Sequence, residues 1–359
     1  MDDKKSESTR QITKLLELTV KQNSSDLHLV PGEPPSLRID GRVVKADAKP
    51  YESGEIQELI YSMLTEEQIS HLENYKELDC AFSFEKVGRF RVNVAREVNG
   101  FYATLRHIRD EIPDVREIGF PTDVWKDIIK LNNGLVLVTG ITGSGKSTTL
   151  ASLIQEISRT HSYKIICVED PVEYVYSRGD AKNKSLIVQR AVGYDTNSFA
   201  NAVKQSLRQD PDVILIGEIR DKETAQEALR ASETGHLVLS TLHTNDAEGT
   251  LGRYLDFFES DLQSEVRGVL AQNLRYVLCQ QLVPYARGVN RTLAMEILKN
   301  NSGIANMIRS GKTHQIASAI QTGRKDGMIL MDDCLEMLCS QGRISSELRD
   351  RYKSYRQKQ

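Results

Sequence analysis

LVLVTGITGSGKSTTLASLIQEIS, residues 135–158, is the stretch of sequence that decides the fold. At its centre GITGSGKS (140–147, here called the P-loop) matches the pattern G-x-x-x-x-G-K-[S/T] in full. A glycine-rich turn could match this pattern by chance. The apolar, strand-like run before it and the helix-like run after it favour a phosphate-binding loop instead.

The residues of the P-loop have different expected roles. Its glycines permit backbone angles that turn N–H groups inward, and the helix that follows adds its positive end. Lys146 is expected to reach the β- and γ-phosphates of a nucleotide, and the Ser147 hydroxyl to ligate Mg²⁺. The expected nucleotide-binding residues are Gly140, Thr142, Gly143, Ser144, Gly145, Lys146, Ser147 and Thr148.

Short β-rich apolar runs alternate with helical segments along this part of the chain. The expected strands are Leu135–Val138, Lys164–Val168, Val213–Ile216 and Leu237–Thr241. Their hydrophobicity is continuous rather than alternating, which is typical of parallel strands buried on both faces. The sequence therefore predicts an α/β domain, with a mostly helical part from about Ala247 onwards.

Acidic residues follow two of these expected strands. Glu169 and Asp170 come directly after one strand, and Glu218 after another. Ligands bind at the carboxyl ends of strands in open α/β sheets, so these acids should converge on the P-loop. Phosphoryl transfer needs one carboxylate to polarise water and another to hold the metal. Each acid alone could instead cap a helix from a loop.

The first hundred residues indicate a separate α+β domain. Apolar residues from Ile12 to Val20 follow helical spacing. A second helix is expected over Ser53–Leu64, and the capping box formed by Thr65 and Gln68 is expected to start a third. Expected strands are Asp79–Phe84, Arg89–Ala95 and Phe101–Ile108, with hairpin turns at Asp40-Gly41 and Asn99-Gly100. Residues 109–122 show neither period and are the expected linker.

Composition sets limits on the class of protein. A chain of 359 residues is long enough for two cores, and its net charge of −3 gives no general attraction to nucleic acid. No apolar run approaches the roughly 18 residues that a spanning helix needs, so we expect a cytoplasmic protein without direct membrane insertion. The five cysteines contain no C-x-x-C pair.

Four motifs in order resemble those of the secretion ATPases. They are the P-loop, EDPVEY (169–174), GEIRD (217–221) and TGHLVLSTLHT (234–244). In the first domain, SSDLHLVPGEPPSLRIDGRV (24–43) and GRFRVN (88–93) resemble the branch of type IV pilus retraction ATPases, so the resemblance covers nearly the whole chain.

The resemblance implies a PAS-like N-terminal domain (1–108), then the linker, then a RecA-like P-loop ATPase domain (123–359). It further implies a homohexamer that binds ATP and Mg²⁺ between subunits and between domains, and that acts on an inner-membrane pilus platform protein to retract the pilus in twitching motility. By motif position, the resemblance implies that Glu169 would be the catalytic base, Glu218 the Walker B acid and a metal residue, and His236 and His243 the two His-box residues. Spacing alone gives those histidines no metal-ligand pattern.

Two arginines of the first domain are further candidates. If Asn99-Gly100 forms a two-residue turn, Val98 pairs with Phe101, and Arg91 and Arg106 lie diagonally on one face, roughly 7–8 Å apart. Two cations beside an apolar face suggest an anion site, and the resemblance places such arginines on the γ-phosphate. A solvated strand face is the alternative, and Arg89 and Arg109 are possible substitutes.

Alternatives within and beyond this family remain open. Assembly and secretion relatives usually carry long extra N-terminal domains, and many carry a four-cysteine metal segment. Here only about 135 residues precede the P-loop strand, and Cys279 has no second cysteine nearby, so the resemblance favours the retraction branch. GIANMIR (303–309) only partly matches a segment typical of retraction enzymes, because Ala305 stands where that segment has an arginine. An accessory, weakly hydrolysing adaptor is therefore a further alternative. Ile304, Met307 and Ile308 could form a docking surface or pack into a core.

Overall fold

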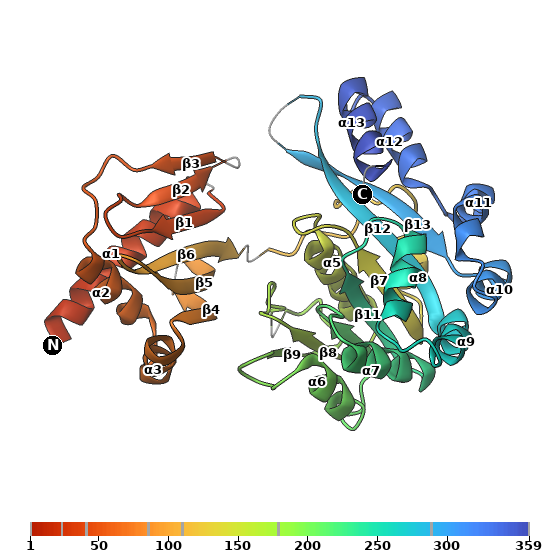
Figure 1. Cartoon of the computed structure of the whole chain (residues 1–359), viewed down its shortest axis with the longest axis horizontal. Coiled ribbons are helices and arrows are strands. Elements are labelled where there is room, and N and C mark those ends of the chain that lie inside the picture. The colour runs from red at the N-terminus through yellow and green to blue at the C-terminus, as the bar shows by residue number, and fades with distance from the viewer. Residues whose placement is uncertain are drawn as a thin grey trace. The chain divides into compact units, whose positions relative to one another are not determined.

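Two compact units make up the chain, Met1–Glu111 and Ile112–Gln359 (Figure 1). They come from a computed structural model, which describes residues 2–22, 24–39, 42–84, 87–108, 111–177, 180–287 and 290–357. Within these ranges, no helix is both long and apolar enough to cross a membrane.

A seven-stranded sheet forms the centre of the second unit, with the strand order β13-β12-β7-β11-β10-β8-β9. Its strands are β7 (Gly134–Thr139), β8 (Lys164–Glu169), β9 (Leu186–Ala191), β10 (Val213–Ile216), β11 (Leu237–Leu242), β12 (Leu274–Pro284) and β13 (Arg291–Lys299). Every neighbouring pair is parallel except β12 with β13. The predicted parallel α/β sheet is confirmed.

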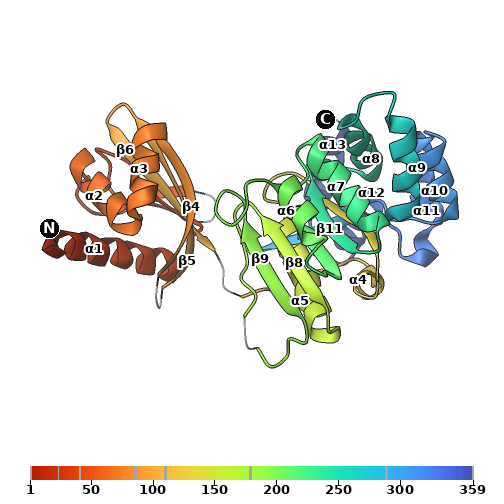
Figure 2. The same cartoon turned by 90° about the horizontal axis from the view of Figure 1, so that it is seen from below.

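Helices cover both faces of this sheet, with α5 and α7 on opposite faces (Figure 2). The helices are α4 (Val124–Ile128), α5 (Lys146–Thr160), α6 (Phe199–Ser206), α7 (Lys222–Glu233), α8 (Ala247–Asp256), α9 (Gln263–Asn273), α10 (Ser302–Arg309), α11 (Ile316–Thr322), α12 (Met331–Ser340) and α13 (Ser346–Gln357). Strand β10 is continuously apolar in sequence because both of its faces are buried. Val213 and Leu215 pack into one core cluster, whereas Ile214 and Ile216 pack into the other.

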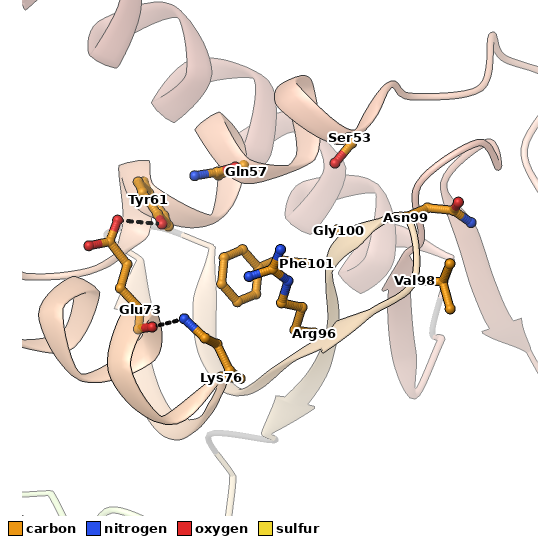
Figure 3. A pocket seen from close by; sticks show the side chains of 10 residues that line it. All are labelled: Ser53, Gln57, Tyr61, Glu73, Lys76, Arg96, Val98, Asn99, Gly100 and Phe101. Carbon is orange, nitrogen blue, oxygen red and sulfur yellow. Dashed lines mark hydrogen bonds between the residues drawn. The ribbon is translucent and has the colours of Figure 1, made fainter.

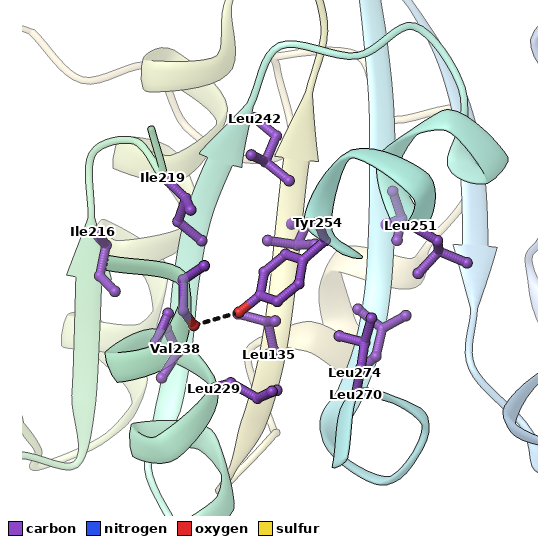
Figure 4. Packing of buried hydrophobic residues seen from close by; sticks show 14 of the residues in the cluster. Leu135, Ile216, Ile219, Leu229, Val238, Leu242, Leu251, Tyr254, Leu270 and Leu274 are labelled. Carbon is purple, nitrogen blue, oxygen red and sulfur yellow. Dashed lines mark hydrogen bonds between the residues drawn. The ribbon is translucent and has the colours of Figure 1, made fainter. Parts of the chain in front are cut away.

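Tyr254 of α8 is the largest fully buried side chain in one of these clusters (Figure 4). Its hydroxyl donates a hydrogen bond to the carbonyl oxygen of Ala225 in α7, at 2.7 Å. Burial raises the pKa of the Tyr254 hydroxyl, so this group remains a protonated donor. The hydrogen bond joins two helices that pack on the same face of the sheet.

Three strands of the second unit were missed by the sequence analysis. Strand β9 is an edge strand whose Leu186 and Val188 are exposed, so its apolar residues do not mark a core face. Strands β12 and β13 lie in the part that was expected to be mostly helical. Buried Gln280 and Gln281 interrupt the apolar run of β12, and the sequence therefore did not read as a strand.

The first unit contains a six-stranded antiparallel sheet with the order β3-β2-β1-β6-β5-β4. Its elements are α1 (Asp2–Lys21), β1 (Asp26–Leu29), β2 (Ser36–Ile39), β3 (Arg42–Lys45), α2 (Ser53–Met63), α3 (Glu66–Tyr75), β4 (Glu77–Phe84), β5 (Gly88–Glu97) and β6 (Gly100–Ile108). The capping box at Thr65 and Gln68 is confirmed. Apolar residues of β5 and β6 pack with α1 and α2 in one core cluster.

The hairpin between β5 and β6 differs from the prediction by one residue. Glu97 pairs with Gly100, so the turn is Val98-Asn99 rather than Asn99-Gly100, and Arg91 lies directly opposite Arg106. Moving the turn by one residue changes the pairing of β5 with β6 by two residues. Each side chain therefore stays on the face of the sheet that was predicted for it. The other predicted turn, Asp40-Gly41, lies outside the described residues, and Ile39 pairs with Arg42 beside it.

Gly100 has a conformation and a packing position that exclude a side chain. Its φ is +140°, and a Cβ built there would lie 2.1 Å from the Ser53 Oγ of α2. Gly32 provides a matched control, because its φ is +79° but a Cβ there would meet no atom within 4 Å.

We expect Gly100→Ala to lower the free energy of unfolding by at least ~2 kcal/mol, since backbone strain and the steric clash add. Gly32→Ala carries only the strain and should cost ~1 kcal/mol. Urea denaturation of both full-length variants measures the difference. Equal losses would show that the contact with Ser53 contributes nothing.

Candidate functional site

The P-loop joins the end of β7 to the start of α5. Gly140, Gly143 and Gly145 all have positive φ values, of 143°, 77° and 90°, so the loop depends on residues without a Cβ. Lys146 Nζ donates to the carbonyl oxygens of Gly140 and Ile141, at 2.8 and 3.2 Å. Burial lowers the pKa of Lys146, while the charges of Glu218 and Glu173 oppose this shift. The ammonium group is therefore desolvated and suited to a phosphate.

Side chains of the P-loop do not all face the same way. Thr142 is exposed and Ser147 is half-buried, as a ligand-facing position requires. The Ser144 hydroxyl is instead buried beneath the loop, without a hydrogen-bond partner in the described ranges. Any contact of Ser144 with a nucleotide would therefore come from its backbone N–H, and its place among the nucleotide-binding residues stays a prediction.

Strand β12 supports the P-loop from below. Gln280 Nε2 donates to the Ser144 carbonyl oxygen at 2.8 Å. A Cβ on Gly140 would come within 2.3 Å of the Gln280 carbonyl oxygen, so the two backbones are closely packed. Sequence reasoning missed Gln280. No local pattern points to it, because its partner lies 136 residues away in the chain.

The predicted convergence of acidic groups is confirmed. Strands β8, β10, β11 and β7 are neighbours and run parallel, so their carboxyl ends share one edge of the sheet. Glu169 ends β8, and Glu218 comes two residues after β10. Both glutamates therefore lie at the edge that carries the P-loop.

Glu218 has two close partners at this edge. His243 Nε2 lies 3.0 Å from its Oε1, and an Arg220 nitrogen lies 3.0 Å from its Oε2. A second Arg220 nitrogen is 3.6 Å from the Asp170 carboxylate. The histidine and the arginine thus hold the Glu218 carboxylate from both sides.

Glu169 is buried and held by the segment that follows it. Its Oε2 accepts from the backbone N–H of Glu173 at 3.3 Å, and its Oε1 from Gln189 Nε2 at 3.4 Å. The same segment reaches α5, where the Tyr174 hydroxyl lies 2.9 Å from Thr148 Oγ1. Thr148 is thus near the P-loop but is already hydrogen bonded within the protein.

His236 lies far from His243. His236 precedes β11 and His243 follows it, so the two rings are separated by roughly 20 Å, the length of the strand and its flanks. His236 Nδ1 lies 3.0 Å from the Ala231 carbonyl oxygen, at the end of α7. His236 therefore lies away from the P-loop of its own chain, and its role as a catalytic residue stays a prediction.

The two arginines of the first unit are each paired with a carboxylate. Arg91 donates to both oxygens of Asp79, the shortest contact being 2.6 Å, and Arg106 Nε donates to Asp26 at 2.8 Å. Burial raises the pKa of Asp26, but hydrogen bonds from Ser25 and Arg106 outweigh burial and leave the pKa below its ordinary value. A phosphate-binding role for these arginines stays a prediction, and Arg109 lies outside the described residues.

A metal site made only of protein side chains is absent from the described residues, since none of them form a group of three or more His, Cys, Asp or Glu that could hold an ion. Mg²⁺ usually takes one or two protein ligands together with waters and substrate phosphates. The half-buried Ser147 hydroxyl and the Glu218 carboxylate fit such a sparse set.

Two cavities were found elsewhere in the described parts of the chain. One of about 470 Å³ lies in the first unit, between α2, α3 and the β5–β6 hairpin (Figure 3). There the Tyr61 hydroxyl donates to Glu73 at 3.0 Å, and Arg96 lies over the Phe101 ring. The other, of about 550 Å³, surrounds Trp125. No P-loop residue lines either cavity, so neither is the phosphate site.

GIANMIR (303–309) belongs to α10. Ile304 and Ile308 are buried in the core, and Met307 packs partly against it, whereas Asn306 and Arg309 are exposed. Of the two alternatives for these apolar residues, core packing is the correct one.

A complete P-loop at the carboxyl edge of a parallel sheet, with glutamates following two neighbouring strands, defines a P-loop ATPase. Comparisons with known proteins narrow this class. The family described as Type II/IV secretion system protein matches residues 2–348.

Individual relatives cover most of the chain. The type IV pilus retractation ATPase PilT of Pseudomonas aeruginosa is 42% identical over 336 residues, which are 94% of this chain and 96% of PilT. The type IV pilus ATPase PilU of the same organism is 37% identical, covering 93% of this chain and 86% of PilU. A crystal structure of the pilus retraction motor PilT with bound ADP is similar with a TM-score of 0.86 and 42% identity, over 94% of this chain and 95% of that one. The chain belongs to the family of type II/IV secretion system proteins.

We expect Lys146→Ala to weaken ADP and ATP binding about 10- to 100-fold, because a charge-assisted hydrogen bond to phosphate is lost. Isothermal titration calorimetry on the full chain measures the dissociation constants. Lys204→Ala, at an exposed position of α6, is the matched control and should bind as the wild type does. Unchanged affinity of Lys146→Ala would contradict the assignment of the P-loop lysine.

Proposed function

We propose that this protein is an ATP-hydrolysing motor that drives type IV pilus retraction as a homohexamer. The similarity to PilT carries this proposal, because it extends over 94% of this chain and 96% of PilT. The P-loop lysine, both glutamates and His243 are present and lie at one edge of the sheet. The partner on the membrane side is a pilus platform protein, reached from the cytoplasmic face of the inner membrane.

The site residues have separate roles in this proposal. Lys146 exchanges its loop carbonyls for the β- and γ-phosphate oxygens, and backbone N–H groups of the P-loop hold the same phosphates. Glu169 orients the attacking water and accepts its proton. Glu218 and Ser147 would hold Mg²⁺, which would supply charge neutralisation at the phosphates. His243 fixes the orientation of Glu218 through their 3.0 Å contact.

The finer description of the fold is also part of the proposal. We infer that the first unit is a PAS-like domain, because helices pack on one face of an antiparallel sheet there. The second unit is RecA-like, with the linker at residues 109–122. His236 lies at the other edge of the sheet, apart from Glu218 and His243, and its part in the reaction stays a prediction.

A second candidate function is an accessory ATPase of the same machinery. PilU is 37% identical over 93% of this chain, and Ala305 replaces the arginine expected in α10. An assembly or secretion ATPase is less well supported, since Cys279 is buried and no group of cysteines and histidines in the described residues could hold a metal.

Two carboxylate variants test the hydrolysis mechanism. Glu169→Gln should bind ATP but lose turnover about 10²- to 10⁴-fold, because the general base is removed. We expect a comparable loss in Glu218→Gln through the metal. Glu265→Gln, on the exposed surface of α9, should retain wild-type turnover. Near-wild-type hydrolysis by either site variant would refute the role of that glutamate.

The ring motor is tested by the steady-state ATPase rate against protein concentration, with light scattering on the same samples. The rate per subunit should rise as hexamers form, because the proposed sites are completed between subunits. Glu169→Gln should assemble equally well without hydrolysis. Full activity in the monomer would indicate an ordinary P-loop enzyme, and no activity at any concentration would indicate an adaptor.

A further inference from the structure

The edge strand β9 places one side chain against the acidic segment of the site. Strand β9 pairs only with β8, and Gln189 lies opposite Cys167, two residues before Glu169. From there Gln189 reaches three groups. Its Nε2 donates to the Tyr174 carbonyl oxygen at 2.6 Å and to Glu169 Oε1 at 3.4 Å, and its Oε1 accepts from the Tyr176 N–H at 3.1 Å.

Only one orientation of the Gln189 amide satisfies this arrangement. A carbonyl oxygen of Tyr174 can only accept, and a backbone N–H of Tyr176 can only donate. The oxygen of the amide must therefore face Tyr176, which leaves its NH₂ group facing Tyr174 and Glu169. Tyr176 is buried in the core, so the backbone N–H that binds the amide oxygen has a fixed position.

The segment that Gln189 holds connects two parts of the site. Residues 170–177 contain no helix or strand, so side chains must define their path. At one end Glu169 accepts from the Glu173 N–H. Further along, the Tyr174 hydroxyl contacts Thr148, directly after the P-loop. A change at Gln189 would therefore be felt at Glu169 and at the start of α5.

We propose that Gln189 is a positioning residue for ATP hydrolysis, which holds the Glu169 carboxylate and the segment 170–176 in the geometry that the reaction needs. This inference rests on the proposed function and on Glu169 as its base. Gln189 acts through Glu169 and does not itself touch the reacting atoms. The edge position of β9 suits this role, because one face of the strand can serve the site while the other is exposed.

Three substitutions separate the contacts of the amide. Gln189→Met keeps the approximate length but removes all three hydrogen bonds. Gln189→Glu keeps the acceptor for Tyr176 but places a carboxylate against Glu169. Gln189→Asn keeps the amide one methylene short. The matched control is Val188→Thr on the same strand, whose side chain is 36% exposed and shares none of these contacts.

The experiment measures kcat, KM and the dissociation constant for ADP on the full chain. We expect kcat to fall on the order of tenfold or more in Gln189→Met and Gln189→Glu, the effect of one lost hydrogen bond to a charged group. The dissociation constant for ADP should stay within about threefold of the wild-type value, because the P-loop is intact. Val188→Thr should match the wild type in all three quantities.

A double-variant cycle distinguishes positioning from general stabilisation. If Gln189 acts through Glu169, adding Gln189→Met to Glu169→Gln should reduce the residual turnover no further. Multiplicative losses, wild-type kcat in Gln189→Met and Gln189→Glu, or loss of ADP binding in step with a lower Tm would each overturn the proposal. If the wild type and Val188→Thr fail to hydrolyse ATP, the proposed function itself fails, and the inference fails with it.

Discussion

The parallel register of β8, β10, β11 and β7 is the constraint on which the site depends. Each pairing is in step, so the four strands end at the same edge of the sheet. The strands are buried on both faces, which leaves their connections as the only places where polar groups can gather. Strand order then matters more than chain order. The P-loop strand β7 and the Glu169 strand β8 are separated by β11 and β10, which bring His243 and Glu218 between them.

Continuous apolar runs made these central strands predictable from sequence, whereas partner-dependent features were not. Strand β9 exposes Leu186 and Val188, and β12 buries Gln280 and Gln281, so neither has the pattern of a core strand. Gln280 and Gln189 matter through their hydrogen bonds to residues distant in the sequence. Gln280 contacts Ser144, and Gln189 contacts Glu169 and Tyr174. The turn was misplaced by one residue, which changes the pairing by two residues, so the shared face of Arg91 and Arg106 was still predictable. Carboxylate partners such as Asp79 leave no local signal at all.

Charge compensation is a common property of the groups that were singled out. Arg91 pairs with Asp79, Arg106 with Asp26, and Glu218 with Arg220, while Lys146 contacts loop carbonyls. Phosphate oxygens bind a desolvated ammonium more strongly than neutral carbonyls do, so the exchange at Lys146 favours nucleotide. The exchange at an arginine with a bidentate carboxylate is nearly balanced, because one anion replaces another. This difference favours a phosphate contact at Lys146 over one at the arginines, which would have to give up a carboxylate.

Ala305, which stands where retraction enzymes have an arginine, belongs to a helix at the edge of the sheet opposite the P-loop. Strand β13 runs antiparallel to β12 and ends where β12 begins, so α10 starts at the edge away from the P-loop. His236 lies at that same edge, next to the start of β7, since its carbonyl oxygen accepts from the Gly134 N–H. The anchors of α10 are Ile304 and Ile308, and an alanine between them leaves both in place. Ala305 is half-buried and packs against the same core cluster, so the departure from the arginine leaves the fold and the hydrolysis site unchanged. A retraction motor and an accessory ATPase would therefore share the same hydrolytic geometry and differ at the edge of the sheet that carries α10.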